Sequence, residues 1–293
     1  IDAYLGYPAI DKLNGLISMG MDSGYLDIDN EQFDMHFESM FQRSWPFDAA
    51  RGRINYRYDG SAIRISSGLI ELLYGHLSAH GKLQVNIPPG REQHTWGLAI
   101  GVHDGQLLDV HRYLPNTLSP QLLSWLDTSV KGGSLQETGL LFHGSLFRGS
   151  PKIRKVTETY FQVKDGHLAY HPDWPALSNL GATIYLNNSG VYFDGSSARV
   201  LESEISNASV HIPIPFGEAP TTATIVADVQ GPLMDGIRIL NETPIAEQIS
   251  NVALNWSGTG NFAGNLKLDI PLGSRTDRQV YSDVRVSLDD NNI

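Results

Sequence analysis

The chain has 293 residues, which is enough for one large domain or two ordinary ones. Apolar residues make up 41% and charged residues only 18%, so disorder is excluded as the main state of the chain. Lys and Arg total 21 against 32 for Asp and Glu, giving a net charge of −11. Because no basic run is present, the composition argues against a nucleic-acid-binding protein. The absence of cysteine excludes disulfide frameworks, thiolate zinc sites and cysteine nucleophiles.

No stretch of the sequence approaches the roughly 20 apolar residues that span a bilayer. The opening IDAYLGYPAI has neither the basic nor the long apolar region of a signal peptide, and it does not begin with Met. We therefore expect the chain to be a segment of a longer protein.

Alternation of apolar and polar residues is the dominant pattern along the chain. Because successive side chains of a strand point to opposite faces, each such segment has one apolar and one polar face. Strands of a parallel sheet would instead read as continuous apolar runs, so the pattern favours an antiparallel sheet. The clearest segments are 33–38, 53–58, 82–87, 180–187 and 265–270.

Three short polar motifs predict hairpin turns, because Asp, Asn and Gly tolerate positive φ. They are Asp59-Gly60, Asp165-Gly166 and Asn188-Ser189-Gly190, each lying between two segments of strand character.

Two segments break the strand pattern and predict helices. At 119–131, Ser119 is a candidate N-cap, Pro120 opens the first turn, and Gly132-Gly133 is expected to close the helix. A weaker helical pattern covers 232–241.

The motifs that could carry chemistry are weak. His76 and His80 have the spacing of a helical zinc site but lack the Glu that a metalloprotease needs after the first His. The acidic run 27–31 lacks the Gly of a calcium loop. The glycines of 258–264 are interpreted as a hairpin loop, since a strand rather than a helix follows them. We expect no catalytic residue, metal or cofactor. A pair of catalytic carboxylates, as in glycosidases, is an alternative that the sequence does not exclude, because it does not give the distance between carboxylates.

Five tryptophans raise the possibility of a sugar-stacking platform. Packing on apolar faces is the favoured interpretation, with Trp96 and Trp256 placed inside alternating strands and Trp125 on the apolar side of the first helix. The five are Trp45, Trp96, Trp125, Trp174 and Trp256.

Several sequence runs, and the order in which they occur, resemble the YhdP branch of the AsmA-like, TamB-related proteins of Gram-negative bacteria. The opening block with ARGRINYRYDG at 50–60 fits the same family, so the resemblance covers nearly the whole chain. The runs are YLPNTLSPQLLSWLDTSVKGG at 113–133, GLLFHGSLF at 139–147, the segment 169–214, ETPIAEQI at 242–249 and GNFAGNLKLDIPL at 260–272.

The resemblance implies a repeating β-groove that binds acyl chains and conducts phospholipids between the inner and outer membranes. It implies a periplasmic location, with the full-length protein anchored to the inner membrane by a transmembrane helix absent from this chain. It does not identify protein partners in either membrane, and it implies no enzymatic activity. The expected organisation is a groove segment at 1–171, carrying the helical insertion near 119–131, and a second segment at 172–293 that continues the same sheet.

The residues themselves favour the same fold. A sheet with one continuous apolar face must bury it against a second sheet, helices or a ligand, and two short helices are too few to cover it. We therefore expect a mainly β fold, with an elongated antiparallel sheet curled into a groove and one or two short helices. A closed β-sandwich that serves as a binding or structural module is the alternative.

Alternate residues of each predicted strand share one face, and this rule, which we call strand parity, gives the residues expected to line the lipid groove. A shift of one residue in any strand would exchange the two faces of that strand. They are Phe33, Met35, Phe37, Ile54, Tyr56, Ile63, Ile65, Leu83, Val85, Leu98, Ile100, Phe161, Val163, Ile184, Leu186, Val191, Phe193, Ile225, Val229, Leu254, Trp256, Leu266, Leu268 and Ile270.

Overall fold

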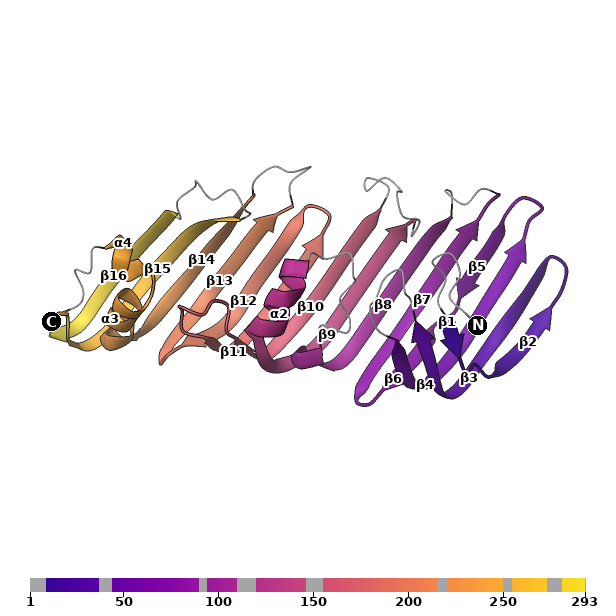
Figure 1. The fold of residues 1–293 in the computed structure, drawn as a ribbon, viewed down its shortest axis with the longest axis horizontal. Helices are drawn as coiled ribbons and strands as arrows, with labels where there is room; N and C mark the ends of the chain where they lie inside the picture. The colour runs from indigo at the N-terminus through magenta and orange to yellow at the C-terminus, as the bar shows by residue number, and fades with distance from the viewer. Residues whose placement is uncertain are drawn as a thin grey trace. The chain divides into compact units, whose positions relative to one another are not determined.

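The structure, a computed structural model, is mostly β (Figure 1). Its strands form one large antiparallel sheet, in the order β1-β3-β4-β5-β7-β8-β9-β10-β11-β12-β13-β14-β15-β16, with β2 on β3 and β6 between β4 and β7. The mainly β, antiparallel fold predicted from the alternation is therefore confirmed. The residues that the structure describes are 9–36, 44–89, 94–109, 120–145, 155–214, 221–249, 255–272 and 281–292.

Most strands are long, between 11 and 15 residues. In chain order they are β1 (Ala9–Asp11), β2 (Gly15–Met19), β3 (Ser23–His36), β4 (Trp45–Tyr58), β5 (Ile63–Ser67), β6 (Ile70–Tyr74), β7 (Leu77–Ile87), β8 (Thr95–Gln106), β9 (Val130–Gly144), β10 (Val156–Leu168), β11 (Leu177–Asn187), β12 (Gly190–Val200), β13 (Ser203–Pro213), β14 (Thr221–Pro232), β15 (Thr259–Leu272) and β16 (Tyr281–Asn292).

The chain divides into two compact units, and the boundaries between them fall within α2, β9 and β10. Unit 1 comprises 1–123 and 135–161, and unit 2 comprises 124–134 and 162–293.

Irregular residues inside the strands shift the alternation in both units. Each has a positive φ. The more buried residues on its two sides are three positions apart in sequence, whereas regular alternation would place them two positions apart. Such irregularities bend a strand and increase its local twist. The five are Gln32 in β3, Asp104 in β8, Asp165 in β10, Asn179 in β11 and Asn207 in β13, with φ values between 48° and 60°.

Helices are short in the described residues, and none is long and apolar enough to cross a membrane. The predicted helix at 119–131 is α2, and the one at 232–241 is α3. Ser119, the expected N-cap, lies outside the described residues. The helical elements are the 3₁₀ turn η2 (Leu107–Asp109), α2 (Pro120–Ser129), α3 (Leu233–Glu242) and α4 (Ile245–Gln248).

The helix α2 is fixed at its C-terminal end by hydrogen bonds to the segment that follows β10. Trp125 Nε1 donates to the carbonyl oxygen of Tyr170 at 3.0 Å, and the amide of Ala169 donates to the carbonyl oxygen of Ser129 at 2.7 Å. Burial raises the pKa of Tyr170 to about 12. These contacts, all within unit 2, hold α2 in one place.

Three local predictions are wrong. Gly132 and Gly133 do not end α2, because they lie inside β9, where Gly133 has a φ of 118°. Asp165-Gly166 is a bulge within β10 rather than a hairpin turn. The glycines at 260 and 264 lie inside β15 instead of in a loop, and a Cβ at Gly264 would lie only 2.7 Å from the carbonyl oxygen of Arg285 on β16.

The other two turn motifs do form turns, and each is built on one acceptor side chain. Between β11 and β12, Asn187 Oδ1 accepts from the amides of Ser189 at 2.8 Å and Gly190 at 3.1 Å. Between β4 and β5, Asp59 Oδ1 accepts from the hydroxyl and amide of Ser61 and from the amide of Ala62.

The Asp59 turn should make stability depend on pH. The hydrogen bonds from Ser61 and Ala62, together with Arg64 at 2.8 Å, lower the pKa of Asp59 from 3.8 to about 2. Because the folded-state pKa lies below the unfolded one, this stabilisation is present above pH ~4 and is lost as the pH falls toward ~2. We expect Asp59→Ala to lower the urea midpoint at pH 7, and the difference from wild type to vanish near pH 2. A difference that persisted unchanged at pH 2 would contradict this role.

Candidate functional site

Unit 2 has a continuous apolar face that crosses β11–β16. One row joins Ile184 to Phe193 and Phe193 to Val210, and continues through Ile225 to Leu268. Because paired residues of antiparallel strands share a face, these side chains lie on one side of the sheet. We call this side the apolar face of unit 2. Further rows on it are Leu186, Val191 and Ile212; Ala198, Ile205, Val229, Gly264 and Val286; and Phe262 with Leu288.

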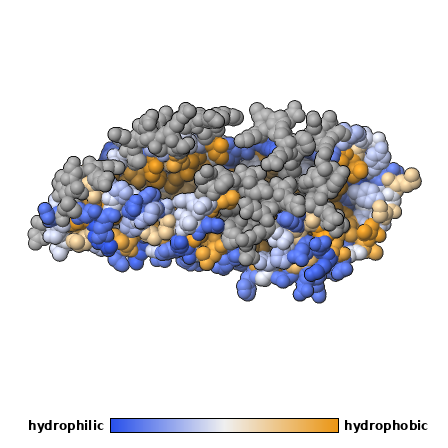
Figure 2. Space-filling model, in the orientation of Figure 1, coloured by the Kyte–Doolittle hydropathy of each residue, from blue (hydrophilic) through white to orange (hydrophobic). Residues whose placement is uncertain are grey.

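The large side chains of this face are only partly buried. Ile184, Phe193, Ile225 and Leu268 all retain intermediate exposure, whereas a closed sandwich would bury them. Toward the edge strand β16, Val284 is 54% exposed. Figure 2 shows hydrophobic surface in a hollow over the strands of this unit. The face therefore carries much apolar surface that no second layer of the described residues covers.

Charged strand residues of unit 2 lie on the opposite, polar face. Asp194, Lys267 and Asp283 belong to rows one position away from the apolar rows. Asp228 accepts hydrogen bonds from the side-chain amides of Asn207 and Asn265, which lower its pKa. The described strands of the unit thus separate charge from apolar surface.

Unit 1 has a corresponding apolar face across β3–β8. Tyr56 pairs with Ile65, Ile65 with Val85, and Val85 with Trp96. Leu26 and Ile54 form a neighbouring pair on the same side. The charged ladder on the other side includes the two-pronged Arg53–Asp27 pair, at 2.5 and 2.7 Å, and Arg53 lies 4.3 Å from the ring centre of Tyr25.

One end of this face in unit 1 is a packed core. Phe33 and Phe47 are paired across β3 and β4, and their rings stack at 5.2 Å. They lie on the same side as Ala50 and Ile28 because the alternation shifts at Gln32. Next to them lies Asn30, which is only 1% exposed. Its side chain donates to the carbonyl oxygen of Lys12 and accepts from the amide of Asn14, so it fixes the segment that connects β1 and β2.

Most residues predicted from strand parity lie together on the two apolar faces. In unit 2, Val163 packs beside Leu180, close to Gly166. Phe161, the last residue of unit 1, lies on β10 and is partly buried. On the face of unit 1 are Phe33, Met35, Ile54, Tyr56, Ile63, Ile65, Leu83, Val85, Leu98 and Ile100; on that of unit 2 are Val163, Ile184, Leu186, Val191, Phe193, Ile225, Val229, Leu266, Leu268 and Ile270.

Three predicted residues stand apart from these faces. Phe37 and Leu254 lie outside the described residues. Trp256 lies before β15 rather than inside a strand, and it is 48% exposed, so its predicted strand position is wrong. The alternation continues back through Gly264 and Gly260, but β15 begins at Thr259, three residues after Trp256.

Other residues of the apolar faces were missed by strand parity. Ile205 and Ile212 lie on one face of β13, but the bulge at Asn207 places them an odd number of positions apart. Val284, Val286 and Leu288 alternate regularly and could have been found from the pattern alone.

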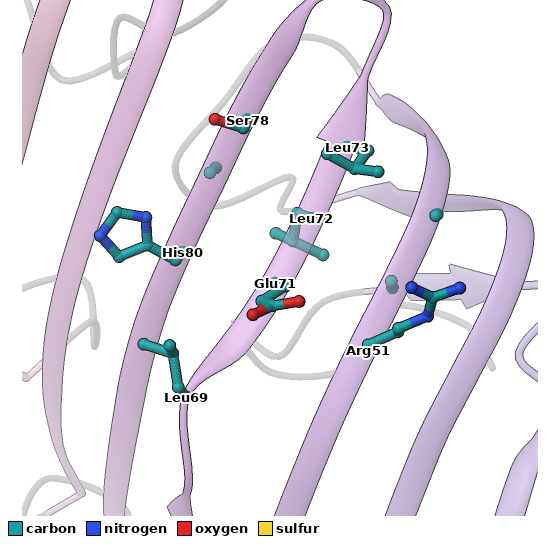
Figure 3. A pocket seen from close by; sticks show the side chains of 10 residues that line it. Arg51, Leu69, Glu71, Leu72, Leu73, Ser78 and His80 are labelled. Carbon is teal, nitrogen blue, oxygen red and sulfur yellow. The ribbon is translucent and has the colours of Figure 1, made fainter.

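A pocket of about 390 Å³ lies in unit 1, among β4, β6 and β7 (Figure 3). Arg51, Glu71 and His80 belong to one row of the polar side, and Leu69 lies where β5 gives way to β6. Its charged residues are therefore on the side opposite the apolar face. Within the described ranges, no group of three or more His, Cys, Asp or Glu residues is placed to hold a metal ion.

Comparisons with known proteins identify a family and one relative of the chain. The family described as YhdP protein matches residues 2–293. The chain is 22% identical over 272 residues to the protein named Intermembrane phospholipid transporter YhdP of Escherichia coli strain K12. That match covers 90% of this chain and 21% of the relative, so the chain spans about a fifth of the relative's length. No solved structure matches the chain. The match to the YhdP family over almost every residue shows that the chain belongs to that family.

Proposed function

We propose that the apolar faces of both units bind phospholipid acyl chains, and that the chain is one segment of a periplasmic path for phospholipids between the inner and outer membranes. The observation that carries the proposal is the continuous apolar face of unit 2, whose large side chains stay partly exposed, with charged strand residues on the other side. The similarity to a protein named as an intermembrane phospholipid transporter supports it.

The energetics fit acyl chains as ligands. Each buried methylene contributes about 0.8 kcal/mol, so roughly ten of them would hold one acyl chain by ~8 kcal/mol before ordering costs. Because the apolar rows repeat from strand to strand, a chain that moves across the strands exchanges one set of aliphatic contacts for a similar one. On such a surface an acyl chain is expected to slide from strand to strand rather than to stay bound at one position.

A closed β-sandwich is the weaker alternative. It requires a second sheet over the apolar face, and the described strands form a single sheet. We propose no enzymatic role, since binding and sliding of acyl chains need only the apolar face. In the longer protein, we propose that an inner-membrane anchor outside this chain holds the segment in the periplasm.

Native mass spectrometry of the chain purified from a Gram-negative host tests the proposal. The expected result is a series of masses above that of the polypeptide, each matching whole phospholipids that collision releases. A polypeptide that stays lipid-free after purification and after incubation with phosphatidylethanolamine vesicles would contradict the function.

A further inference from the structure

One end of the apolar face of unit 2 is occupied by α3. The helix packs against β14 and β15, and a Cβ at Gly236 would lie 3.5 Å from the ring of Phe262, which belongs to the apolar face. Leu233 and Ile237 are buried on the docked side of the helix. Figure 1 shows α3 in front of the lower ends of these strands. We call this the α3 end.

A buried carboxylate fastens α3 in this position. Asp235, 5% exposed, accepts from the hydroxyl of Ser203 at 2.8 Å and from the amide of Glu202 at 2.9 Å. Ser203 is fully buried and begins β13 on the apolar side, paired with Val200. The helix is therefore tied to the turn between β12 and β13, 32 residues away in sequence.

The other end of the same strands differs. There the face ends in Leu186, Val191 and Ile212, beside the Asn187–Gly190 turn and away from the contacts that α3 makes with Phe262 and Ser203. We call this the hairpin end. Between Ile205 and Ile212 on β13, a strand rise of about 3.3 Å per residue gives at most ~23 Å, enough for the ~15 Å of one leaflet's hydrocarbon.

We propose that phospholipids bind unit 2 in one orientation, with headgroups at the hairpin end and the methyl ends of the acyl chains toward α3. The inference rests on the proposed function and deepens it. The α3 end is filled by helix side chains and holds a buried carboxylate, which would repel a lipid phosphate placed beside it. A headgroup there would also have to leave water, whereas the hairpin end lies beside the polar Asn187–Gly190 turn.

Fluorescence quenching with two spin-labelled lipids tests the orientation. The chain has no cysteine, so Ile205→Cys and Ile212→Cys give single labelling sites on one face of one strand, near opposite ends. Each variant carries bimane and is loaded with phosphatidylcholine bearing a doxyl group at carbon 5 or at carbon 16. We expect the ratio of carbon-5 to carbon-16 quenching to exceed one at Ile212→Cys and to fall below one at Ile205→Cys.

The outcomes separate the orientation from the function. The reversed ratios, or equal ratios at the two sites, would overturn the orientation while still placing lipid on the apolar face. Loss of quenching by both lipids at both sites would contradict the proposed function itself. The same bimane label at Ser209→Cys, on the polar face, supplies the background quenching.

Discussion

Replacing Ile225 with Asp should strongly weaken lipid binding to unit 2 while the sheet remains folded. Ile225 lies in the middle of the apolar face, between Val210 on β13 and Leu268 on β15. In the lipid-free protein water reaches this position, because the side chain is only partly buried. When acyl chains cover it, an unpaired carboxylate costs several kcal/mol, so we expect affinity at pH 7 to fall about 100-fold.

Val226 supplies a matched control in the same strand. It is 41% exposed on the polar face, beside Ser209 and Lys267. Val226→Asp therefore introduces the same charge one residue away, where we expect affinity and thermal stability close to wild type. The measurement is titration with phosphatidylethanolamine vesicles, accompanied by thermal unfolding. Equal loss of binding in both variants, with lowered stability, would indicate misfolding and contradict the face assignment.

Removal of the Asp235 carboxylate should have the second large effect, on stability and on α3. In Asp235→Ala the buried hydroxyl of Ser203 and the amide of Glu202 lose their acceptor. Because an unsatisfied buried donor costs roughly 1–3 kcal/mol, we expect the free energy of unfolding to fall by about 2–3 kcal/mol. Hydrogen exchange should speed up across Leu233–Glu242 more than in β11.

Two further variants serve as comparisons, and both are expected to have smaller effects on stability. Ser203→Ala removes one donor together with its need for an acceptor, so its cost should be smaller. Arg238→Ala removes an exposed i,i+4 pair with Glu242 and should change stability by less than ~1 kcal/mol. If Asp235→Ala left both stability and exchange at wild-type values, α3 would not depend on this carboxylate.

Strand parity predicted the apolar faces well because an apolar face fixes the register of each strand. In β14 and β15, Ile225 and Leu268 follow the alternation without interruption, and the structure pairs them directly. Parity fails where a polar residue adopts positive φ inside a strand. Asp165-Gly166 has the composition of a turn and forms a bulge, since turns and bulges need the same backbone conformation.

The placement of α3 could not be predicted from local pattern. Its helical spacing is visible in the sequence, but the hydrogen bond that fixes it joins Asp235 to Ser203 at the start of β13, 32 residues earlier. The same limit applies to Ile205 and Ile212, whose shared face depends on the irregularity at Asn207. Contacts between residues far apart in sequence decide these features, and alternation describes only neighbours.

The most direct test of the account is photocrosslinking at two adjacent positions of β12. Phe193 lies on the apolar face, paired with Ile184 and Val210, and Tyr192 lies on the polar face, where its ring stacks on His211 at 4.6 Å. Benzoylphenylalanine replaces each residue in turn with a side chain of similar shape, in the full-length protein in cells. The account predicts phospholipid adducts at position 193 and none above background at position 192. Equal labelling at the two positions, or labelling confined to 192, would contradict binding of acyl chains by the apolar face.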